Sequence, residues 1–442
     1  MPFIEPRVLK GFRDFLPVQE LARRDMIEKI EKVFRSFGFV PIDTPALEYA
    51  EILLGKGGGE TEKQIYRFAD QGGRDVALRF DLTVPFARFT AEHRAELILP
   101  FKRYHIAKVW RGENTQKGRY REFTQCDFDI VGSDSVSADF EIILIIYRTM
   151  QELCNCSPVT IRLNHRGLFS RFLASLGLEE KSPEILRQVD KLAKIGRDGV
   201  RERLEEIIAA PSLETAGVSS GKKDSQKILD FISLGEEKDF DTILKKLRET
   251  AGDGTDIQRL EQLGLFIKDA GVSEGIVLDT SITRGLDYYT GVVFETFLDK
   301  LPGIGSVCSG GRYDNLAALY SKEQIPGVGS SIGLDRLQAA LEELDQNKSG
   351  GRYADAAVSC LSAENTGKAQ KTAEDFRREG INCEVFFDAK KVSEHYIAAE
   401  KKSIPWVIIP DYDSGKFTVR NIAARESREN IDLIAAVNII KG

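Results

Sequence analysis

Apolar side chains recur at helical spacing near the start of the chain. From Glu20 to Phe37 they follow every three or four residues, which predicts an amphipathic helix, and Gly38 is placed to end it. The next stretch, Phe39–Pro45, has an extended pattern with two prolines. Because proline cannot donate to a strand ladder, we expect this stretch at a sheet edge or boundary.

Short runs rich in β-branched and aromatic residues predict the strands of a sheet. They are Ala77–Phe80, Lys102–Arg111, Phe123–Val131, Val159–Leu163, Gly275–Asp279, Val292–Phe297 and Gly305–Ser309. Between the third and fourth of these runs lies a strongly apolar helical segment, Ala138–Leu153, which we expect to be buried against the sheet.

The pattern becomes purely helical after about Leu178. Glu, Lys, Leu and Ile recur there at helical spacing, broken at Ser219–Lys223, until strand patterns return at Gly275. We therefore expect a helical insertion at about residues 179–272, inside a unit that spans residues 1–344.

A polar stretch at residues 345–352 has the composition of a linker. Strand and helix patterns alternate after it, in residues 353–442: Ala354–Cys360, Asn365–Arg378, Asn382–Phe387, Val392–Lys401 and Trp406–Ile409. This alternation predicts a separate, small and mostly parallel α/β domain.

The composition is that of a folded protein with several domains. Of the 442 residues, 42% are hydrophobic and 30% are charged, which excludes disordered and low-complexity classes. The longest apolar run, Ile142–Tyr147, is far shorter than the ~20 residues of a membrane helix. Met1–Lys10 lacks the apolar core of a signal peptide, so we expect a cytoplasmic protein with no membrane partner.

The six cysteines show no regular spacing, which argues against a disulfide framework. Cys154 and Cys156 form a Cys-x-Cys pair, but neither a second pair nor a nearby histidine completes a four-ligand site. We expect no protein-bound metal.

The charge is unevenly distributed. The formal net charge is −7, which argues against a general nucleic-acid coat, yet Lys102–Arg121 carries seven Lys/Arg and one acid for a net of +6. The aromatic residues Tyr104, Trp110 and Tyr120 are interleaved with these cations. Such a mixture favours contact with phosphates and bases.

Glycine-rich loops and histidines offer little chemistry by themselves. Gly55–Glu60 matches neither phosphate-binding fingerprint. Ser309–Tyr313 follows a predicted strand and precedes a predicted helix, Asp314–Tyr320, so its backbone is open to close approach by a ligand. The four histidines lie far apart with no nucleophile elbow, and we interpret them as structural.

Arginines in strand-like or glycine-flanked contexts are the stronger candidates: Arg111, Arg284 and Arg336. A guanidinium donates two parallel hydrogen bonds and stays charged, which suits phosphate groups.

Three segments resemble the motifs of the class II aminoacyl-tRNA synthetases. Gly38–Pro45 resembles motif 1, Arg103–Gly132 resembles motif 2 and Gly327–Leu337 resembles motif 3. Three further segments are similar to the signature and opening segments of the histidyl-tRNA synthetase family: Arg284–Gly291, Ser309–Asp314 and Lys10–Pro17. The resemblance runs along the whole chain, in the family's order.

This resemblance implies an α+β fold. A class II catalytic domain with an antiparallel sheet flanked by helices would carry a helical insertion and a C-terminal α/β anticodon-binding domain. The implied reaction converts L-histidine and ATP, with Mg²⁺, to histidyl-adenylate and pyrophosphate, and then transfers histidine to the 3′ end of tRNA(His). It needs positioning and charge stabilisation rather than a protein nucleophile. Motif 1 would form the interface of a homodimer.

The resemblance also implies which residues bind ATP. Arg111 and Arg284 would act as catalytic residues at the α-phosphate. Glu113 would recognise the adenine amino group, and Phe123 and Arg336 would sandwich the adenine ring.

For histidine, the resemblance implies that Asp81 and Thr83 bind the α-amino group and that Gln125 lies near the amino-acid backbone. Asp129 and Tyr289, with Tyr288 beside it, would bind the imidazole edge. In the motif 2 loop, the tRNA acceptor end would contact Gln116, Lys117 and Arg119.

Some features depart from the bacterial pattern of the family. Arg79–Thr83 and Gln125–Asp129 look like the eukaryotic and archaeal variant, and Asn114 stands where bacterial members often carry Arg. The resemblance therefore does not define which residue would contact the extra 5′ guanosine of tRNA(His).

Two other functions share parts of this pattern. The first is that of the non-charging paralogue that regulates ATP phosphoribosyltransferase, which usually lacks the C-terminal domain and parts of the signature segments. The second is a synthetase for proline, threonine or glycine, which would share the three motifs but lack Arg284–Gly291.

Overall fold

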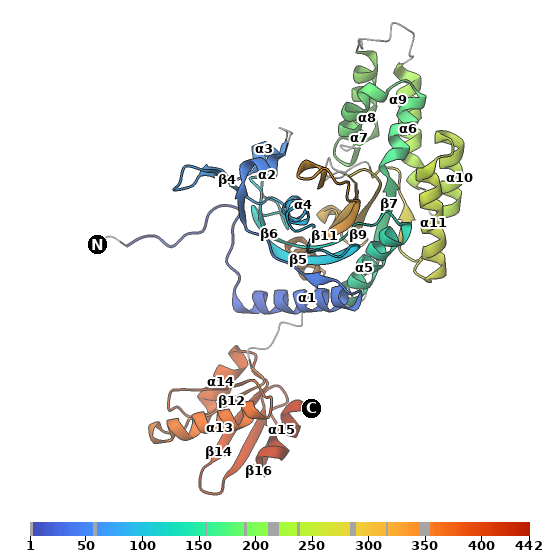
Figure 1. Ribbon diagram of the computed structural model, residues 1–442. Helices are drawn as coiled ribbons and strands as arrows, with labels where there is room; N and C mark the ends of the chain where they lie inside the picture. Colours follow the sequence, from blue (N-terminus) through green and yellow to red (C-terminus); the bar gives the residue numbers. More distant parts are fainter. Residues whose placement is uncertain are drawn as a thin grey trace. The chain divides into compact units, whose positions relative to one another are not determined.

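The computed structural model describes residues 3–55, 60–154, 157–189, 192–210, 221–236, 239–282, 289–314, 317–344 and 354–442. Their elements divide into two compact units, a large one that includes residues 23–344 and a small one built on residues 354–442 (Figure 1). In the described part of the chain, no helix is long and apolar enough to cross a membrane.

Helix α1 (Pro17–Ser36) confirms the first helical prediction. Gly38 has a φ of 77°, and its amide donates to the carbonyl of Arg35 at 3.0 Å while the Phe39 amide donates to Phe34 at 3.2 Å. This pair of bonds closes the helix end in the way that a glycine with positive φ permits. Strand β1 (Val40–Pro41) follows at the edge of the large sheet, as its prolines predict.

The large unit is organised around an eight-stranded sheet. Its order is β1, β5 (Phe101–Trp110), β6 (Glu122–Val131), β11 (Gly327–Gly333), β10 (Cys308–Tyr313), β9 (Val292–Leu298), β7 (Val159–His165) and β8 (Ile276–Leu278). The pairs β1–β5 and β7–β8 are parallel, and all the pairs between them are antiparallel. The sheet is therefore mainly antiparallel, as the sequence predicts.

One prediction for this sheet is wrong. Ser309–Tyr313 is not a loop after a strand but part of β10, paired on both sides. The described residues after it form only a short 3₁₀ turn, Ala317–Leu319, in place of the helix expected at Asp314–Tyr320. Gly310 and Gly311 gave the segment its loop-like sequence, but glycine also occurs within strands where other groups approach closely.

Helices cover one face of the sheet: α1, α5 (Val136–Cys154) and α12 (Leu334–Glu343) (Figure 1). Phe34 of α1, Ile142 of α5 and Leu337 of α12 share one core with Phe128 of β6. The apolar helix predicted at Ala138–Leu153 is thus buried, as expected.

The opposite face carries a smaller group of elements. Helix α4 (Thr83–Glu92) packs there through Phe86 against Val131 and Tyr313. A three-stranded sheet, β2 (Leu47–Tyr49), β4 (Asp75–Leu78) and β3 (Arg67–Ala69), lies nearby with α2 (Ala50–Leu54) and α3 (Glu60–Gln64).

Every described element between Leu178 and Ala270 is helical, as predicted. After α6 (Arg166–Ser175) they are the 3₁₀ turn Glu179–Lys181, α7 (Ser182–Val189), α8 (Leu192–Ala209), α9 (Gly221–Ser233), the 3₁₀ turn Leu234–Glu236, α10 (Phe240–Ala251) and α11 (Thr255–Asp269). These helices form a group beside the end of the sheet that β7 and β8 make up (Figure 1).

The small unit has a five-stranded sheet in the order β13 (Cys383–Val385), β12 (Ala356–Val358), β14 (Trp406–Asp411), β15 (Lys416–Asn421) and β16 (Ser427–Ile431). The first three strands are parallel, as predicted, whereas β15 and β16 are antiparallel additions that the sequence pattern missed. Strand β16 is largely exposed and polar, and β15 is half-buried with only two large apolar residues, Phe417 and Val419, so neither carries a strong apolar signal. Helices α13 (Thr366–Arg378), α14 (Val392–Lys401) and α15 (Leu433–Lys441) complete the unit.

Candidate active site

Strand alternation places carboxylates on the sheet face opposite the helical core. Along β6, Cys126, Phe128 and Ile130 belong to the core. Because successive side chains point to opposite faces, Gln125, Asp127 and Asp129 lie on the other face. Asp127 and Asp129 are fully buried there.

Asp129 is held from two sides. Arg103, its cross-strand partner on β5, places Nη2 at 2.7 Å from Oδ2, and Tyr313 of β10 donates its hydroxyl to Oδ1 at 2.6 Å. The Arg103 guanidinium lies 4.1 Å over the ring of Phe86. Burial raises the pKa of Asp129, and Arg103 opposes that shift. Arg103 and Tyr313 therefore fix the position of the carboxylate.

Tyr313 is a site residue that we did not predict individually. The sequence signal was available, since Ser309–Asp314 stands out as a signature-like segment. What the sequence does not show is that β10 brings the Tyr313 hydroxyl onto Asp129, 184 positions earlier in the chain.

Asp81 and Asp127 form a second acidic group, in which the effect of burial outweighs the attraction of Arg103. Asp81 accepts the amide of Val84 at 3.1 Å through Oδ1, and Oδ2 has no hydrogen-bond partner among the described residues. Thr83 donates to Asp127 at 3.5 Å. Burial raises the pKa of Asp81 to about 6 and that of Asp127 to about 7. Buried acceptors of this kind suit a cationic, hydrogen-bond-donating ligand.

Gln125 and Tyr289 complete this side of the site. Gln125 donates Nε2 to Ser331 at 2.8 Å, and within the described chain its Oε1 has no partner. Tyr289 is half-buried. Residues Arg284 and Tyr288 lie outside the described residues. We name Asp81, Asp127 and Asp129, together with Arg103, the carboxylate half of the site.

Glycines on β10 and β11 make room for the side chains of this half. A Cβ added at Gly329 would overlap Oδ1 of Asp129, and one at Gly327 would overlap the ring of Tyr313. A Cβ at Gly311 would lie 3.0 Å from the ring of Tyr289. These three positions share the sheet face of Asp129, so glycine at each of them lets a site side chain lie directly against the backbone of the sheet.

Arginines gather at the other end of β5 and β6. Arg111 donates Nε to the carbonyl of Phe80 at 2.9 Å, and its guanidinium lies 5.2 Å from the ring centre of Phe123. Arg336, at the start of α12, donates to the carbonyl of Ser306 at 2.7 Å. Burial, followed by the positive charges of Arg119 and Arg111, lowers the pKa of Arg336. Several cations around one half-buried place favour an anionic ligand.

The loop between β5 and β6, residues 112–121, lies beside these arginines, and we call it the motif 2 loop. Glu113 pairs with Arg119 at 2.6 Å, Gln116 bridges to Arg119, and Lys117 pairs with Glu343 at 2.6 Å. The side chains of Lys117 and Arg119 are 67% and 46% exposed. We name Arg111, Phe123, Arg336 and this loop the arginine half of the site.

The basic stretch Lys102–Arg121 is not one continuous surface. Arg103 is fully buried on Asp129, while Lys102 pairs with Glu141 at 2.5 Å and Lys108 with Glu122 at 2.7 Å. The strand's alternation separates these cations, and only the part beyond Trp110 contributes to the arginine half.

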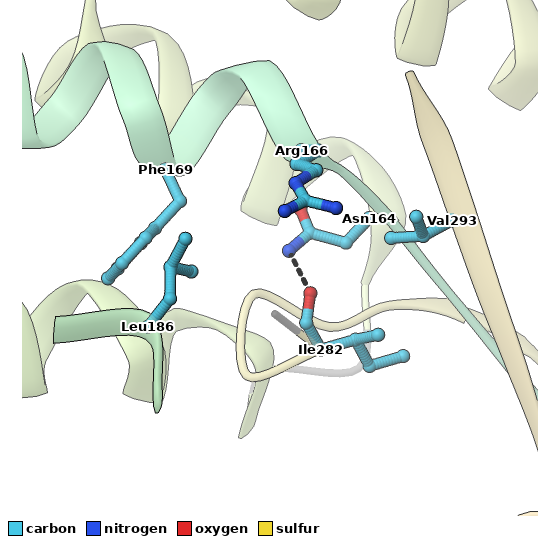
Figure 2. Close-up of a pocket in the computed structure, with 6 residues that line it drawn as sticks. All are labelled: Asn164, Arg166, Phe169, Leu186, Ile282 and Val293. Atoms are coloured by element: carbon cyan, nitrogen blue, oxygen red, sulfur yellow. Dashed lines mark hydrogen bonds between the residues drawn. The ribbon is translucent and has the colours of Figure 1, made fainter. Parts of the chain in front are cut away.

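The backbone on both sides of residues 283–288 is hydrogen-bonded to neighbouring residues at the end of β7. Asn164, at the end of β7, donates Nδ2 to the carbonyl of Ile282 at 2.8 Å, as Figure 2 shows. The amide of Arg166 donates to the carbonyl of Gly291 at 2.9 Å. A small pocket lies between these residues and Phe169 and Leu186 of α6 and α7.

A buried ion network links β10 to the insertion. Arg312, next to Tyr313, donates Nε to Asp139 of α5 at 2.8 Å. Arg259 of α11 donates to the other oxygen of Asp139 at 2.6 Å. Because Arg312 and Asp139 are fully buried, this network holds β10 firmly beside the site.

Among the described residues, no group of His, Cys, Asp and Glu side chains could hold a metal ion. Cys154 is a buried free thiol whose pKa burial raises to about 12, and Cys156 lies outside the described residues.

Comparisons with known proteins agree on one family. The family model described as Histidyl-tRNA synthetase matches residues 11–337, and that described as Anticodon binding domain matches residues 355–442. Histidine–tRNA ligase of Treponema denticola is 54% identical over 93% of this chain and 90% of its own length. The Rhodopirellula baltica enzyme of that name is 45% identical over 96% and 95%.

A solved structure extends this agreement to the fold. The histidyl-tRNA synthetase of Nostoc sp. PCC 7120 is 30% identical, covers 99% of both chains and superposes with a TM-score of 0.85. Sequence and fold thus agree over nearly the full length of the chain. The chain belongs to the histidyl-tRNA synthetase family.

Proposed function

We propose that this protein activates L-histidine with ATP and transfers the histidyl group to tRNA(His). The observation that carries the proposal is the meeting of two opposite halves on one sheet face. A buried carboxylate half suits the amino and imidazole groups of histidine, and the adjoining arginine half suits a nucleotide phosphate.

In the proposed first step, the histidine carboxylate attacks the α-phosphorus of ATP and pyrophosphate leaves. Arg111 and Arg284 stabilise the charge that grows on the α-phosphate oxygens. Phe123 and Arg336 hold the adenine ring between them, and Glu113 accepts from the adenine amino group. Mg²⁺ enters as part of the nucleotide substrate.

On the carboxylate half, Asp81 and Thr83 bind the α-amino group of histidine and Gln125 lies at its backbone. Asp129 and Tyr289, with Tyr288, bind the imidazole edge. We add Tyr313 to this set because its hydroxyl donates to Asp129 at 2.6 Å and so fixes the oxygens left for the ligand.

In the proposed second step, the terminal ribose hydroxyl of tRNA attacks the acyl carbonyl. Gln116, Lys117 and Arg119 of the motif 2 loop contact the acceptor end. We assign residues 1–344 to catalysis, with the insertion at 179–272, residues 345–352 to a linker and residues 353–442 to anticodon binding.

We also propose a cytoplasmic homodimer. Large apolar side chains are exposed on neighbouring elements of the large unit, among them Val40 on β1, Leu47 and Tyr49 on β2, and Phe68 on β3. Exposed apolar groups gathered on neighbouring strands are typical of an interface. Motif 1 contains Val40, in agreement with its role in the class.

Pyrophosphate exchange into ATP, measured with each amino acid in turn, tests this function. Exchange with histidine alone is the expected result. Histidine binding without any exchange would instead favour the regulatory paralogue, against which the match of residues 355–442 to the anticodon-binding family already argues.

Removal of residues 353–442 tests the assignment of the small unit. Adenylate formation should persist, because the large unit has a core of its own, whereas charging of tRNA should fall steeply. Full charging by the truncated protein would refute the anticodon role.

A further inference from the structure

The N-terminal segment lies directly against the motif 2 loop. The amide of Arg121 donates to the carbonyl of Gly11 at 2.8 Å, and the Arg121 side chain donates to Lys10 at 3.4 Å. Gly11 has a φ of 90°, and a Cβ there would lie 2.7 Å from Arg121 and 2.9 Å from Thr115. The close approach therefore requires glycine at this position.

Arg13 makes the central contact of this segment. Its guanidinium lies 4.0 Å from the ring centre of Tyr120, in the motif 2 loop, and 4.3 Å from that of Phe15. It donates Nη1 to the Tyr120 hydroxyl at 3.0 Å and Nη2 to Asp335 at 2.6 Å. Stacking and a charge-assisted bond together favour a single orientation of the planar group.

Asp335 connects this contact to the arginine half. It is buried, accepts the amide of Thr124 at 2.6 Å and lies 3.3 Å from Nη1 of Arg23. Thr124 directly follows Phe123, and Asp335 directly precedes Arg336. The carboxylate therefore joins, at Thr124 and Asp335, the two chain segments that carry the residues we assign to the adenine ring.

We propose that Arg13 is a positioning residue for ATP, acting through Tyr120 and Asp335 without touching the nucleotide. The inference rests on the proposed function. Arg13 holds the motif 2 loop against the start of α12, and Lys117 with Glu343 holds the loop at its tip. Arg23 keeps Asp335 paired when Arg13 is removed, so the loop loses its anchor while the buried carboxylate keeps a partner.

Steady-state pyrophosphate exchange of Arg13→Ala tests the proposal. We expect the KM for ATP to rise about tenfold and the KM for histidine to stay within about twofold of the original value. The KM for ATP of Arg13→Lys should lie between those of the unsubstituted protein and Arg13→Ala, because lysine keeps the charge for Asp335 but loses the planar stack. Arg7→Ala, at an exposed arginine of the same segment, is the matched control and should leave both constants unchanged.

Trypsin cleavage after Lys117 and Arg119 gives a second measurement. Both residues are exposed at the tip of the motif 2 loop. Arg13→Ala should speed cleavage there several-fold, and saturating ATP should restore much of the protection. An Arg13→Ala protein that is merely less stable, with a normal KM for ATP and normal loop cleavage, would overturn the proposal.

Tyr120→Ala keeps the proposal testable if Arg13→Ala fails to fold. It removes the loop side of the contact and leaves Arg13 paired with Asp335. We expect a similar rise in the KM for ATP, and no further rise in the double variant, because both changes break one contact. A normal KM for ATP in Tyr120→Ala refutes the role of Arg13. So does a double variant in which the effects of the two single changes on the KM for ATP add in full. Absence of exchange in the unsubstituted protein would refute the proposed function instead.

Discussion

The two halves of the candidate active site are built in opposite ways. The carboxylate half is fully buried and, apart from Asp81, lies on strands, where Arg103, Asp129 and Tyr313 fix one another over distances below 3 Å. The arginine half reaches into an exposed loop, and its outer cations pair with surface carboxylates. Rigid, desolvated groups give strong discrimination, whereas exposed pairs contribute little energy and rearrange easily.

This difference matches two different tasks. A small amino acid offers few atoms to recognise, so the groups that bind it need fixed places before it arrives. ATP and the acceptor end of tRNA are large and enter in turn, so a half that can rearrange is an advantage. In the function that we propose, the sheet supplies the first kind of site and the motif 2 loop supplies the second.

Asp129→Asn is the most severe way to break the carboxylate half. The amide cannot balance the buried charge of Arg103, and it exchanges an acceptor for a donor facing the imidazole. We expect kcat/KM for histidine to fall by at least about 100-fold, and unfolding free energy to fall by about 3 kcal/mol. Calorimetric titration should show ATP affinity within about threefold of the original. Equal losses for both ligands would show that the two halves are not independent.

Asp127→Asn should stabilise the protein, most clearly at alkaline pH. Burial raises the pKa of Asp127 to about 7, from 3.8 for a free group, so the unfolded chain releases this proton first as the pH rises. The contribution of Asp127 to the free energy of unfolding therefore falls between about pH 4 and pH 7 and then levels off. We expect a gain of about 2–4 kcal/mol at pH 8 and a smaller one at pH 5, measured by urea unfolding. The exposed Asp198→Asn is the control. An equal gain at both pH values would show that burial does not raise the pKa of Asp127.

Gly329→Ala adds one carbon atom, a Cβ, beside Asp129 in the carboxylate half. The new Cβ would overlap Oδ1 of Asp129, so the strands or the carboxylate must move. Unfolding free energy should fall by about 1–3 kcal/mol, and the KM for histidine should rise about tenfold with that for ATP unchanged. Gly303→Ala, which has open space around the added carbon, should change neither quantity. A normal KM for histidine in the folded Gly329→Ala protein would place the ligand elsewhere.

Lys117→Ala tests the exposed end of the arginine half and has the smallest expected effect. The pair with Glu343 is exposed on both sides, so its loss should change unfolding free energy by less than about 0.5 kcal/mol. Charging of tRNA should slow a few-fold at low salt, with normal adenylate formation. Lys29→Ala on α1 serves as the control. Unchanged charging would remove Lys117 from the acceptor contacts.

The sequence predicts the parts of the fold whose residues alternate or repeat with a buried face. The core helix α5 and strand β6 are examples, since one face of each is continuously apolar. Strand β16 escapes prediction because its side chains are mostly exposed, and β15 because only Phe417 and Val419 pack into the core. The mostly buried Ser309–Tyr313 passes for a loop because of its glycines, although its backbone is paired on both sides.

Residue types predict the chemistry of the candidate site better than its geometry. Asp81, Asp129 and Arg111 could be selected from motifs, and the structure places them on one sheet face. The sequence does not show that Arg103 neutralises Asp129, because the strand pairing that joins them depends on register. The contact of Arg13 with Asp335 spans 322 positions and has no local pattern at all.

Gly311, Gly327 and Gly329 limit how the specificity of this protein can change. The side chains of Tyr289, Tyr313 and Asp129 lie directly over these glycines, and glycine has nothing left to remove. A larger residue at any of the three positions would displace a side chain that we assign to the site. Acceptance of a bulkier analogue of histidine must therefore come from shortening side chains such as Tyr289 and Tyr313, or from movement of the strands themselves.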